Sequence, residues 1–226
     1  MPRRTTRSIS HRRGPGRPAG GQSGEAREAL LEAAQELMAE RGLPRVTVRE
    51  VAERAGLQPA LVNYYFGGKE ELLQAVVDRV AGRLLARAAE RADSDGTPRE
   101  RLRAMLRSMV ADLTGESYAP RLIVEQVLFG REEVVDEFVK RFASRQFAIL
   151  DGVVGEGQAS GEFRDLETKF LAPQLLGGAI FFFLAQPVLQ RLFGLDEITP
   201  ELAERYADHF ADVALHGICA PQEPSE

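Results

Sequence analysis

Glycine and proline divide this 226-residue chain into segments with helical periodicity. Apolar side chains recur every three or four residues within these segments, and charged side chains fill the opposite faces. No segment shows the alternation of apolar and polar residues that is typical of a half-buried strand. The sequence therefore predicts an all-α protein. Long helices are expected over residues 99–114, 120–130, 132–157, 167–192 and 199–218, after a set of shorter N-terminal helices.

The first N-terminal helix begins after residue 24. It carries Leu30, Ala34, Leu37 and Met38 on one face and a row of glutamates on the other. Gly42 is its expected end, because glycine is favoured just after a helix C-terminus.

Two short helices joined by a tight turn follow. Thr47 is an N-cap candidate with Glu50 three residues later, which is the capping-box pattern. Gly56 ends this helix. Pro59 suits the start of the next one, because its missing N–H has no helical partner there. These lengths and breaks predict a helix-turn-helix over about residues 47–66.

The second of these helices has an outward face without lysine or glutamate, although a face that meets only water normally carries them. With 100° per residue, Val62 faces the core, whereas Ala60 and Tyr64 point away from it. Ala60 is small enough to let the backbone approach a groove, and Asn63 can form a bidentate contact with adenine. Tyr64 and Tyr65 can donate their hydroxyls to phosphate groups. A short corner inside a helical bundle is the alternative interpretation.

The segment from Thr47 to Leu72, TVREVAERAGLQPALVNYYFGGKEEL, resembles the DNA-binding domain of TetR/AcrR-family transcriptional regulators. The resemblance extends upstream through Ala33 to Gly42 and covers about residues 26–75. It implies a dimer with one recognition helix of each copy in the major groove. It also implies a C-terminal helical domain that dimerises and often holds a ligand pocket.

The resemblance assigns DNA contacts position by position. The residues at positions that meet bases, groove or phosphates in the family are Thr47, Arg49, Pro59, Ala60, Leu61, Asn63, Tyr65 and Lys69. Gln58 replaces the Ser or Thr that usually caps the second helix of the helix-turn-helix. The cap is therefore weaker, or Gln58 is free to contact DNA. Asn63 replaces the usual aromatic residue. Lys69 also has independent support, because the free N–H groups at the start of its helix favour a phosphate.

The N-terminal arm, residues 1–24, contains six arginines and no acidic residue in a chain of net charge −5. Its glycines and prolines and its lack of apolar residues predict disorder in the free protein. Gly16-Arg17-Pro18 resembles the core of AT-hook peptides, which implies that Arg17 reaches the minor groove. A solubilising tail is the alternative. An arm that neutralised five phosphates would steepen the salt dependence of DNA binding by about 4–5 logarithmic units.

The domain organisation expected from these features is a DNA-binding domain at 25–75, an effector-binding and dimerisation domain at 76–219, and a flexible tail at 220–226. Met and aromatic residues with few polar neighbours lie on the helices that would surround a pocket, so we expect an apolar or amphipathic effector. The candidate lining residues are Met105, Met109, Tyr118, Phe129, Phe138, Phe142 and Phe147. Plain core packing is the alternative for each.

The last two long helices are the expected dimer interface. The helix over 167–192 is apolar nearly all round, which indicates burial on more than one face. The resemblance implies that it packs with the final helix against their copies as a four-helix bundle. The candidate interface residues are Leu175, Gly178, Phe182, Tyr206, Phe210, Val213 and Gly217.

Other classes of protein find little support in the sequence. There is one cysteine, Cys219, so an internal disulfide is impossible. His209, His216 and Cys219 match no standard zinc signature, and we expect no metal and no cofactor. No P-loop, nucleophile elbow or dinucleotide loop is present, so an enzyme is not expected. The longest apolar run, 175–185, is too short to span a membrane, and no signal peptide is visible.

We therefore expect a cytoplasmic, homodimeric, ligand-responsive transcription factor. Its expected role is that of a repressor that binds a pseudo-palindromic double-stranded DNA operator and is controlled by a small-molecule effector. A helical protein-interaction module without DNA binding is the alternative.

Overall fold

The computed structural model describes residues 20–41, 46–195 and 197–219, and all segments below lie within these ranges. The described chain is helical apart from turns and one isolated bridge between Phe163 and Cys219. The all-α prediction is therefore confirmed. Arg17, Gly42 and the expected tail at 220–226 lie outside the described residues.

The helices that pack around α4 make up most of the fold. In chain order the segments are α1 (Gly20–Arg41), α2 (Val48–Arg54), α3 (Ala60–Phe66), α4 (Lys69–Ala92), α5 (Pro98–Gly115), α6 (Ala119–Ile123), the π-helix η2 (Val124–Leu128), α7 (Glu132–Phe138), the π-helix η3 (Val139–Ala143), α8 (Ser144–Ala159), α9 (Thr168–Leu184), α10 (Gln186–Phe193) and α11 (Pro200–Ile218).

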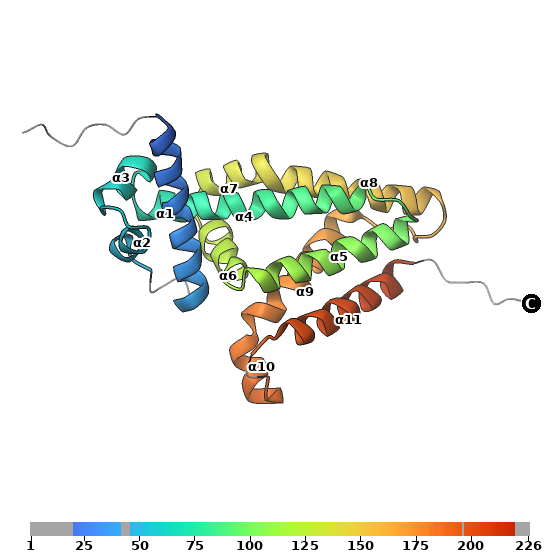
Figure 1. Ribbon diagram of the computed structural model, residues 1–226. Coiled ribbons are helices and arrows are strands. Elements are labelled where there is room, and N and C mark those ends of the chain that lie inside the picture. Colours follow the sequence, from blue (N-terminus) through green and yellow to red (C-terminus); the bar gives the residue numbers. More distant parts are fainter. Residues whose placement is uncertain (1–19, 42–45, 196, 220–226) are drawn as a thin grey trace, which may run out of the picture.

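Helices α1–α3 cluster at one end of α4 and form what we call the head (Figure 1). The body consists of α5–α11 with the rest of α4. Within it, α4, α5 and α8 run side by side, α11 lies along α5, and α10 projects away from the other helices (Figure 1). The expected domain boundary at residue 75 falls inside α4, so a continuous helix joins the head to the body.

The hydrophobic core consists of two clusters. The first joins head and body, because it contains Leu37 and Met38 of α1, Val62 of α3, Val76 of α4 and Leu122 of α6. The second lies deeper in the body and is formed by residues of α5, α8, α9 and α11. Met109 and Phe210 pack against both clusters, so they mark the junction between them.

Two expected boundaries are wrong. Helix α1 begins at Gly20, within the segment predicted to be disordered. Glycine disfavours a helix by only about 1 kcal/mol per residue, so it weakens the first turns of a helix without forbidding them. The helix predicted over 167–192 is broken after Leu184, and α9 and α10 meet at 65°. Pro187 explains the break, because it lacks the N–H that a continuing helix needs and its ring crowds the preceding turn.

Candidate nucleic-acid interface

The turn between α2 and α3 has the geometry that its sequence predicts. Thr47 caps α2: its hydroxyl accepts from the Glu50 N–H, and the Glu50 carboxylate accepts from the Thr47 N–H at 3.1 Å. The chain then reverses at Gly56, whose φ of +68° lies in the left-handed region that favours glycine. Pro59 precedes the first residue of α3, one position earlier than expected, with φ −55°. The capping box and the helix-turn-helix are confirmed.

Helix α3 has one fully buried residue. Val62 is buried in the first core cluster, and Gly67 ends the helix with φ +97°. Because Val62 fixes the inward face, the opposite face is set as well. Ala60 and Asn63 are exposed, and Tyr64 is 59% exposed. The structure thus gathers three of the residues expected to meet DNA on one uncharged, solvent-facing surface.

The remaining candidate residues lie on α2, on or just before α3, or at the start of α4, and they differ in exposure. Gln58 is exposed and Leu61 is half-buried, and α3 has no side-chain cap, so the side chain of Gln58 does not serve as one. Lys69 is exposed at the first residue of α4. Arg49 is 81% exposed and pairs with Glu53 at 2.8 Å, one turn along α2. This pair is too exposed to hold Arg49 firmly, so its guanidinium can exchange partners.

Tyr65 differs from expectation. Its hydroxyl is buried and has no hydrogen-bond partner among the described residues, and its ring packs against the first core cluster. The ring also meets that of Tyr64 edge to face, with centroids 4.9 Å apart. In this structure Tyr65 therefore supports the head from inside, and a phosphate contact would require its side chain to rotate outward. Periodicity missed this because Tyr65 lies at the edge of the buried stripe.

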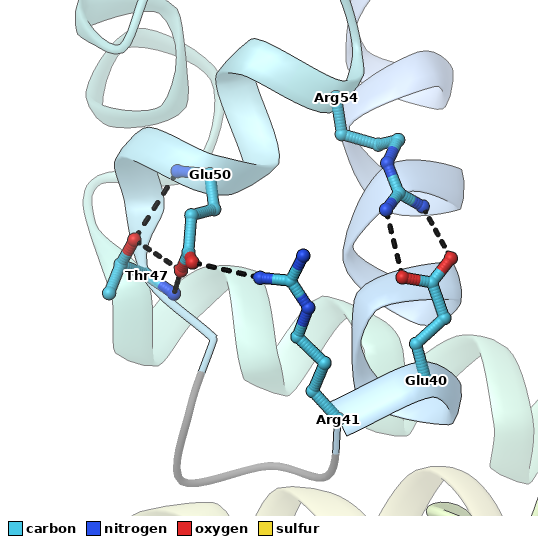
Figure 2. Close-up of polar contacts among 5 residues, drawn as sticks. All are labelled: Glu40, Arg41, Thr47, Glu50 and Arg54. Carbon is cyan, nitrogen blue, oxygen red and sulfur yellow. Dashed lines mark hydrogen bonds and ion pairs between the residues drawn. The ribbon is translucent and has the colours of Figure 1, made fainter.

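Ion pairs fix α2 against α1 (Figure 2). Arg54 donates to both carboxylate oxygens of Glu40, each at 2.9 Å, and to Glu36 at 3.2 Å. Arg41 donates to Glu50 at 3.1 Å. Hydrogen bonds from Arg54 hold the pKa of Glu40 below its ordinary value, and those from Thr47 do the same for Glu50.

These contacts distinguish the roles of the basic residues on α2 and at the start of α4. Arg54 holds the orientation of the helix pair, whereas Arg49 and Lys69 remain at the surface. The fork of the guanidinium explains why Arg54 can engage Glu40 through two parallel bonds. Nothing in its sequence position separates Arg54 from Arg49, and only the approach of α1 does so.

The residues expected to line an effector pocket differ widely in burial. Tyr118 and Phe142 are buried, Met105, Met109 and Phe138 are half-buried, and Phe147 is 39% exposed. Phe129 is 82% exposed at the end of η2, so its assignment to a cavity is wrong: a surface loop places it outside the bundle. Tyr118 instead bonds to Gln35 of α1 at 2.7 Å.

Two grooves occur elsewhere on the body. One, of about 730 Å³, lies between α4, α5 and α11 and has Arg87, Arg91, Arg103 and Arg107 on its walls. Three of these arginines form ion pairs with acidic residues of α5 or α11. The second, of about 600 Å³, lies between the segment 164–175 and α11. None of the seven expected pocket residues lines either groove.

The expected interface residues divide into two sets. Leu175 is buried within the protomer, and Tyr206 stacks on Phe182 at 3.8 Å and donates to the Gly178 carbonyl at 2.7 Å. Phe210 packs beside them, against the place where a Cβ on Gly178 would lie. This aromatic column packs within the protomer, but its members are only half-buried, so their assignment to the interface stays a prediction. Val213 and Gly217 are exposed, as a contact between copies requires.

The structure exposes a further set of apolar residues that the sequence analysis did not single out. They lie on α9 and on the projecting α10, which has no buried residue. The large ones are Phe170, Leu176, Phe181, Leu184, Val188, Leu192 and Phe193. The sequence could have indicated these exposed residues, because α9 is apolar on every side. A single core cannot bury every face of such a helix.

No group of three metal-ligating side chains occurs among the described residues. Within the same residues, no single helix is long and apolar enough to cross a bilayer. Helices α9 and α10 are long and apolar enough to cross a bilayer only when taken together, and they are bent by 65° where they meet.

Comparison with known proteins identifies the family. The family model for bacterial regulatory proteins of the tetR family matches residues 30–76, which contain α2, α3 and the start of α4. A second model, for the tetracyclin repressor-like C-terminal domain, matches residues 95–224, more than half of the chain. The chain belongs to the TetR family of bacterial regulatory proteins.

Similar proteins agree with this assignment. The transcriptional regulator BetI of Rhizobium meliloti is 35% identical over 115 residues, which is 51% of this chain but only 55% of that protein. The fatty acid metabolism regulator protein of Bacillus subtilis is 27% identical over 67% of this chain and 77% of its own length. The structure of the regulator FadR from Bacillus subtilis with stearoyl-CoA superposes with a TM-score of 0.66 at 21% identity, covering 84% of this chain and 98% of that one.

Family membership favours a DNA-binding transcriptional regulator over a helical interaction module. The relatives are transcriptional regulators rather than enzymes. The matched N-terminal region is also the region in which the exposed face of α3 lies.

Proposed function

We propose that this TetR-family chain is a dimeric, ligand-responsive repressor that reads a pseudo-palindromic operator with α3. The observation that carries the proposal is the uncharged, exposed face formed by Ala60, Asn63 and Tyr64, together with the exposed Lys69 at the start of α4. Asn63 supplies a donor and an acceptor on one amide, which suits the major-groove edge of adenine. Tyr64 and Lys69 supply donors for phosphates that fix the register of the helix.

The roles of the neighbouring residues follow from their exposure. Pro59, Leu61 and Gln58 border the reading face at the start of α3, close enough to contact groove walls. Thr47 and Arg49 start α2 at the surface, where they meet the DNA backbone. The arginines of the N-terminal arm, Arg17 among them, add contacts with phosphates or the minor groove and so increase the salt dependence.

The dimer forms through the exposed apolar faces of α9, α10 and α11. Phe170, Phe181 and Phe193 are 60%, 68% and 68% exposed. Since an aromatic side chain buries about 150–250 Å², these three expose roughly 400 Å², about half of what a stable interface covers on each partner. Val213 and Gly217 extend the same surface on α11. Two recognition helices related by a two-fold axis would then meet half-sites about 34–36 Å apart.

The effector site lies at the junction of the two core clusters. Met109 packs against both clusters and Met105 lies one turn away on α5. Unbranched methionine side chains rearrange readily around an apolar guest. Stearoyl-CoA is the first probe, because one structural neighbour is a regulator in complex with that molecule. An effector releases DNA only if it binds the DNA-free arrangement of the heads more tightly than the DNA-bound one.

Fluorescence anisotropy with duplexes selected from a random pool tests DNA reading. Wild type is expected to select one sequence and to bind it more tightly than a scrambled duplex. Asn63→Ala should relax the base preference by about 1–3 kcal/mol at one position. Lys69→Ala should weaken binding to every sequence and lower the salt slope by about one.

The same assay contains its own controls. A chain that lacks residues 1–24 reports the contacts of the arm, and its slope should be lower by about 4–5. Equal binding of selected and scrambled duplexes by wild type would refute sequence reading. An unchanged salt slope for Lys69→Ala would remove its phosphate contact.

A further inference from the structure

A chain of polar contacts joins the head to the body around Tyr118. The Gln35 side chain of α1 donates from Nε2 to the Tyr118 hydroxyl at 2.7 Å, across 83 residues of sequence. Gln35 also accepts from Arg79 of α4 at 3.1 Å, and Arg79 reaches Glu28 of α1 at 2.5 Å. On the other side, the Tyr118 hydroxyl donates to Glu116 at 3.3 Å.

The contacts close into a ring on α4. Glu116 pairs with Arg83 at 2.6 Å, and Arg83 lies one turn beyond Arg79 on the same helix. Helix α4 thus supplies both arginines of the ring, Arg79 and Arg83. Helix α1 supplies Gln35, and the segment before α6 supplies Glu116 and Tyr118.

The direction of each hydrogen bond is fixed by chemistry. An arginine side chain can only donate, so the oxygen of Gln35 must face Arg79 and its NH₂ group must face Tyr118. The Tyr118 oxygen therefore accepts from Gln35, and its own proton is left for Glu116. The hydroxyl of Tyr118 satisfies both neighbours at once, which a phenylalanine at this position could not do.

Because they are partly buried, these hydrogen bonds restrict the orientation of α1 on α4. Tyr118 is 7% exposed, and Gln35 is half-buried. Their neighbours in the first core cluster are apolar, and apolar packing is non-directional. Such packing tolerates small rotations of α1 on α4, whereas a hydrogen bond weakens steeply once its angle is lost.

We infer that Tyr118 is a positioning residue that locks the orientation of the head on the body through the Gln35–Tyr118–Glu116 contacts. A head without this lock samples other orientations, in which α3 no longer presents its reading face at the same place. The locking itself is a property of the fold. Its consequence for operator binding rests on the proposed function.

Spin-label distances in the full chain test the lock without DNA or effector. The single cysteine is replaced by Cys219→Ala, and labels are attached at Glu32→Cys on α1 and Asp151→Cys on α8, both exposed positions. Labelled protein is diluted with unlabelled protein so that distances within one chain dominate. Tyr118→Phe is expected to broaden the distance distribution and to raise the displaced population between about twofold and tenfold, the range that one net hydrogen bond allows.

Tyr206→Phe is the matched control. It also removes one hydroxyl with a 2.7 Å hydrogen bond, but that bond ends on Gly178 inside the body. It should leave the head-to-body distances unchanged even if it lowers stability. Gln35→Leu should broaden the distribution as Tyr118→Phe does, and the double variant should add little, because both remove the same contact. An unchanged distribution for Tyr118→Phe, or equal broadening for Tyr206→Phe, would overturn the lock.

Operator binding separates the lock from the proposed function. On the duplex selected by wild type, Tyr118→Phe should weaken binding by about twofold to tenfold and leave scrambled DNA unaffected, because a freer head must be ordered on the operator. If distances change but operator affinity does not, the lock exists and its role in DNA binding is overturned. If wild type selects no sequence, the proposed function fails, while the distances still decide the lock.

Discussion

Alanine substitutions at two glycines of α8, Gly155 and Gly157, are expected to change stability in opposite directions. Both are interior residues of the same helix, where glycine costs about 0.5–1 kcal/mol relative to alanine. A Cβ on Gly155 would meet nothing within 4 Å. A Cβ on Gly157 would overlap the ring of Phe163, with three ring carbons no farther than 2.6 Å. Phe163 is buried, so its ring has little room to withdraw.

The expected magnitudes follow from these distances. Gly155→Ala should gain about 0.5–1 kcal/mol from helix propensity alone. Gly157→Ala gains the same but suffers overpacking of about 1–3 kcal/mol, which gives a net loss of up to about 2.5 kcal/mol. The two variants differ by the overpacking cost alone. For a chain of this size each kcal/mol moves Tm by about 2–4 °C, so they should differ by roughly 2–12 °C.

Thermal unfolding followed by circular dichroism measures the difference. All variants must be compared at one protein concentration, because subunit association shifts Tm. Adding Phe163→Leu to Gly157→Ala should relieve part of the loss, so the two effects will not add. A Gly157→Ala protein as stable as Gly155→Ala would refute the reasoning, since it would mean that Phe163 does not pack against the helix backbone.

Three further predictions concern the head, Tyr118 and the dimer. Thr47→Ala and Thr97→Ala each remove the N-cap of a capping box and should each cost about 1 kcal/mol in urea unfolding, but only Thr47→Ala should also weaken DNA binding. Equal effects of the two on DNA would contradict a backbone contact by Thr47. Burial raises the pKa of Tyr118 to about 12. The neutral hydroxyl is thus favoured in the folded state. Its contribution to the free energy of unfolding is complete below about pH 10, and about 2–3 kcal/mol is lost as the pH rises toward about 12. Tyr118→Phe should lose less stability than wild type between about pH 9 and pH 11 in urea unfolding, and a parallel loss would speak against this origin. Phe181→Asp should convert the dimer to monomer in analytical ultracentrifugation, whereas Phe129→Asp, on a still more exposed phenylalanine outside the apolar faces of α9–α11, should not. A dimer that survives Phe181→Asp would place the interface elsewhere.

Local signals sufficed to predict the helix-turn-helix. Thr47 and Glu50 contact each other within one helical turn, and Gly56 acts through its own backbone conformation. Their roles can therefore be predicted from the local sequence. Val62 and Ala60 are assigned to opposite faces by helical geometry alone, and the structure confirms both. Lys69 begins α4 as predicted, because the Gly-Gly pair before it ends α3.

The body shows where such signals end. The sequence offers Tyr118 and Phe129 alike as pocket residues, yet the first is hydrogen-bonded to α1 and the second is exposed at the surface. Leu175 and Phe181 are both apolar residues of α9, and only the packing of α5, α8 and α11 decides that the first is buried and the second is not. A stripe states that a residue has an apolar neighbour, but it does not state on which helix that neighbour lies.

The sequence by itself determined the helical class, the two-helix reading motif and the family, because these depend on turns, caps and spacing within short segments. The tertiary structure decided which arginine stabilises the head, which tyrosine joins head to body and which apolar face of α9 is left uncovered. Those assignments depend on contacts between residues as distant as Gln35 and Tyr118. Such contacts form only once the helices have packed, because the sequence around each residue does not identify its distant partner.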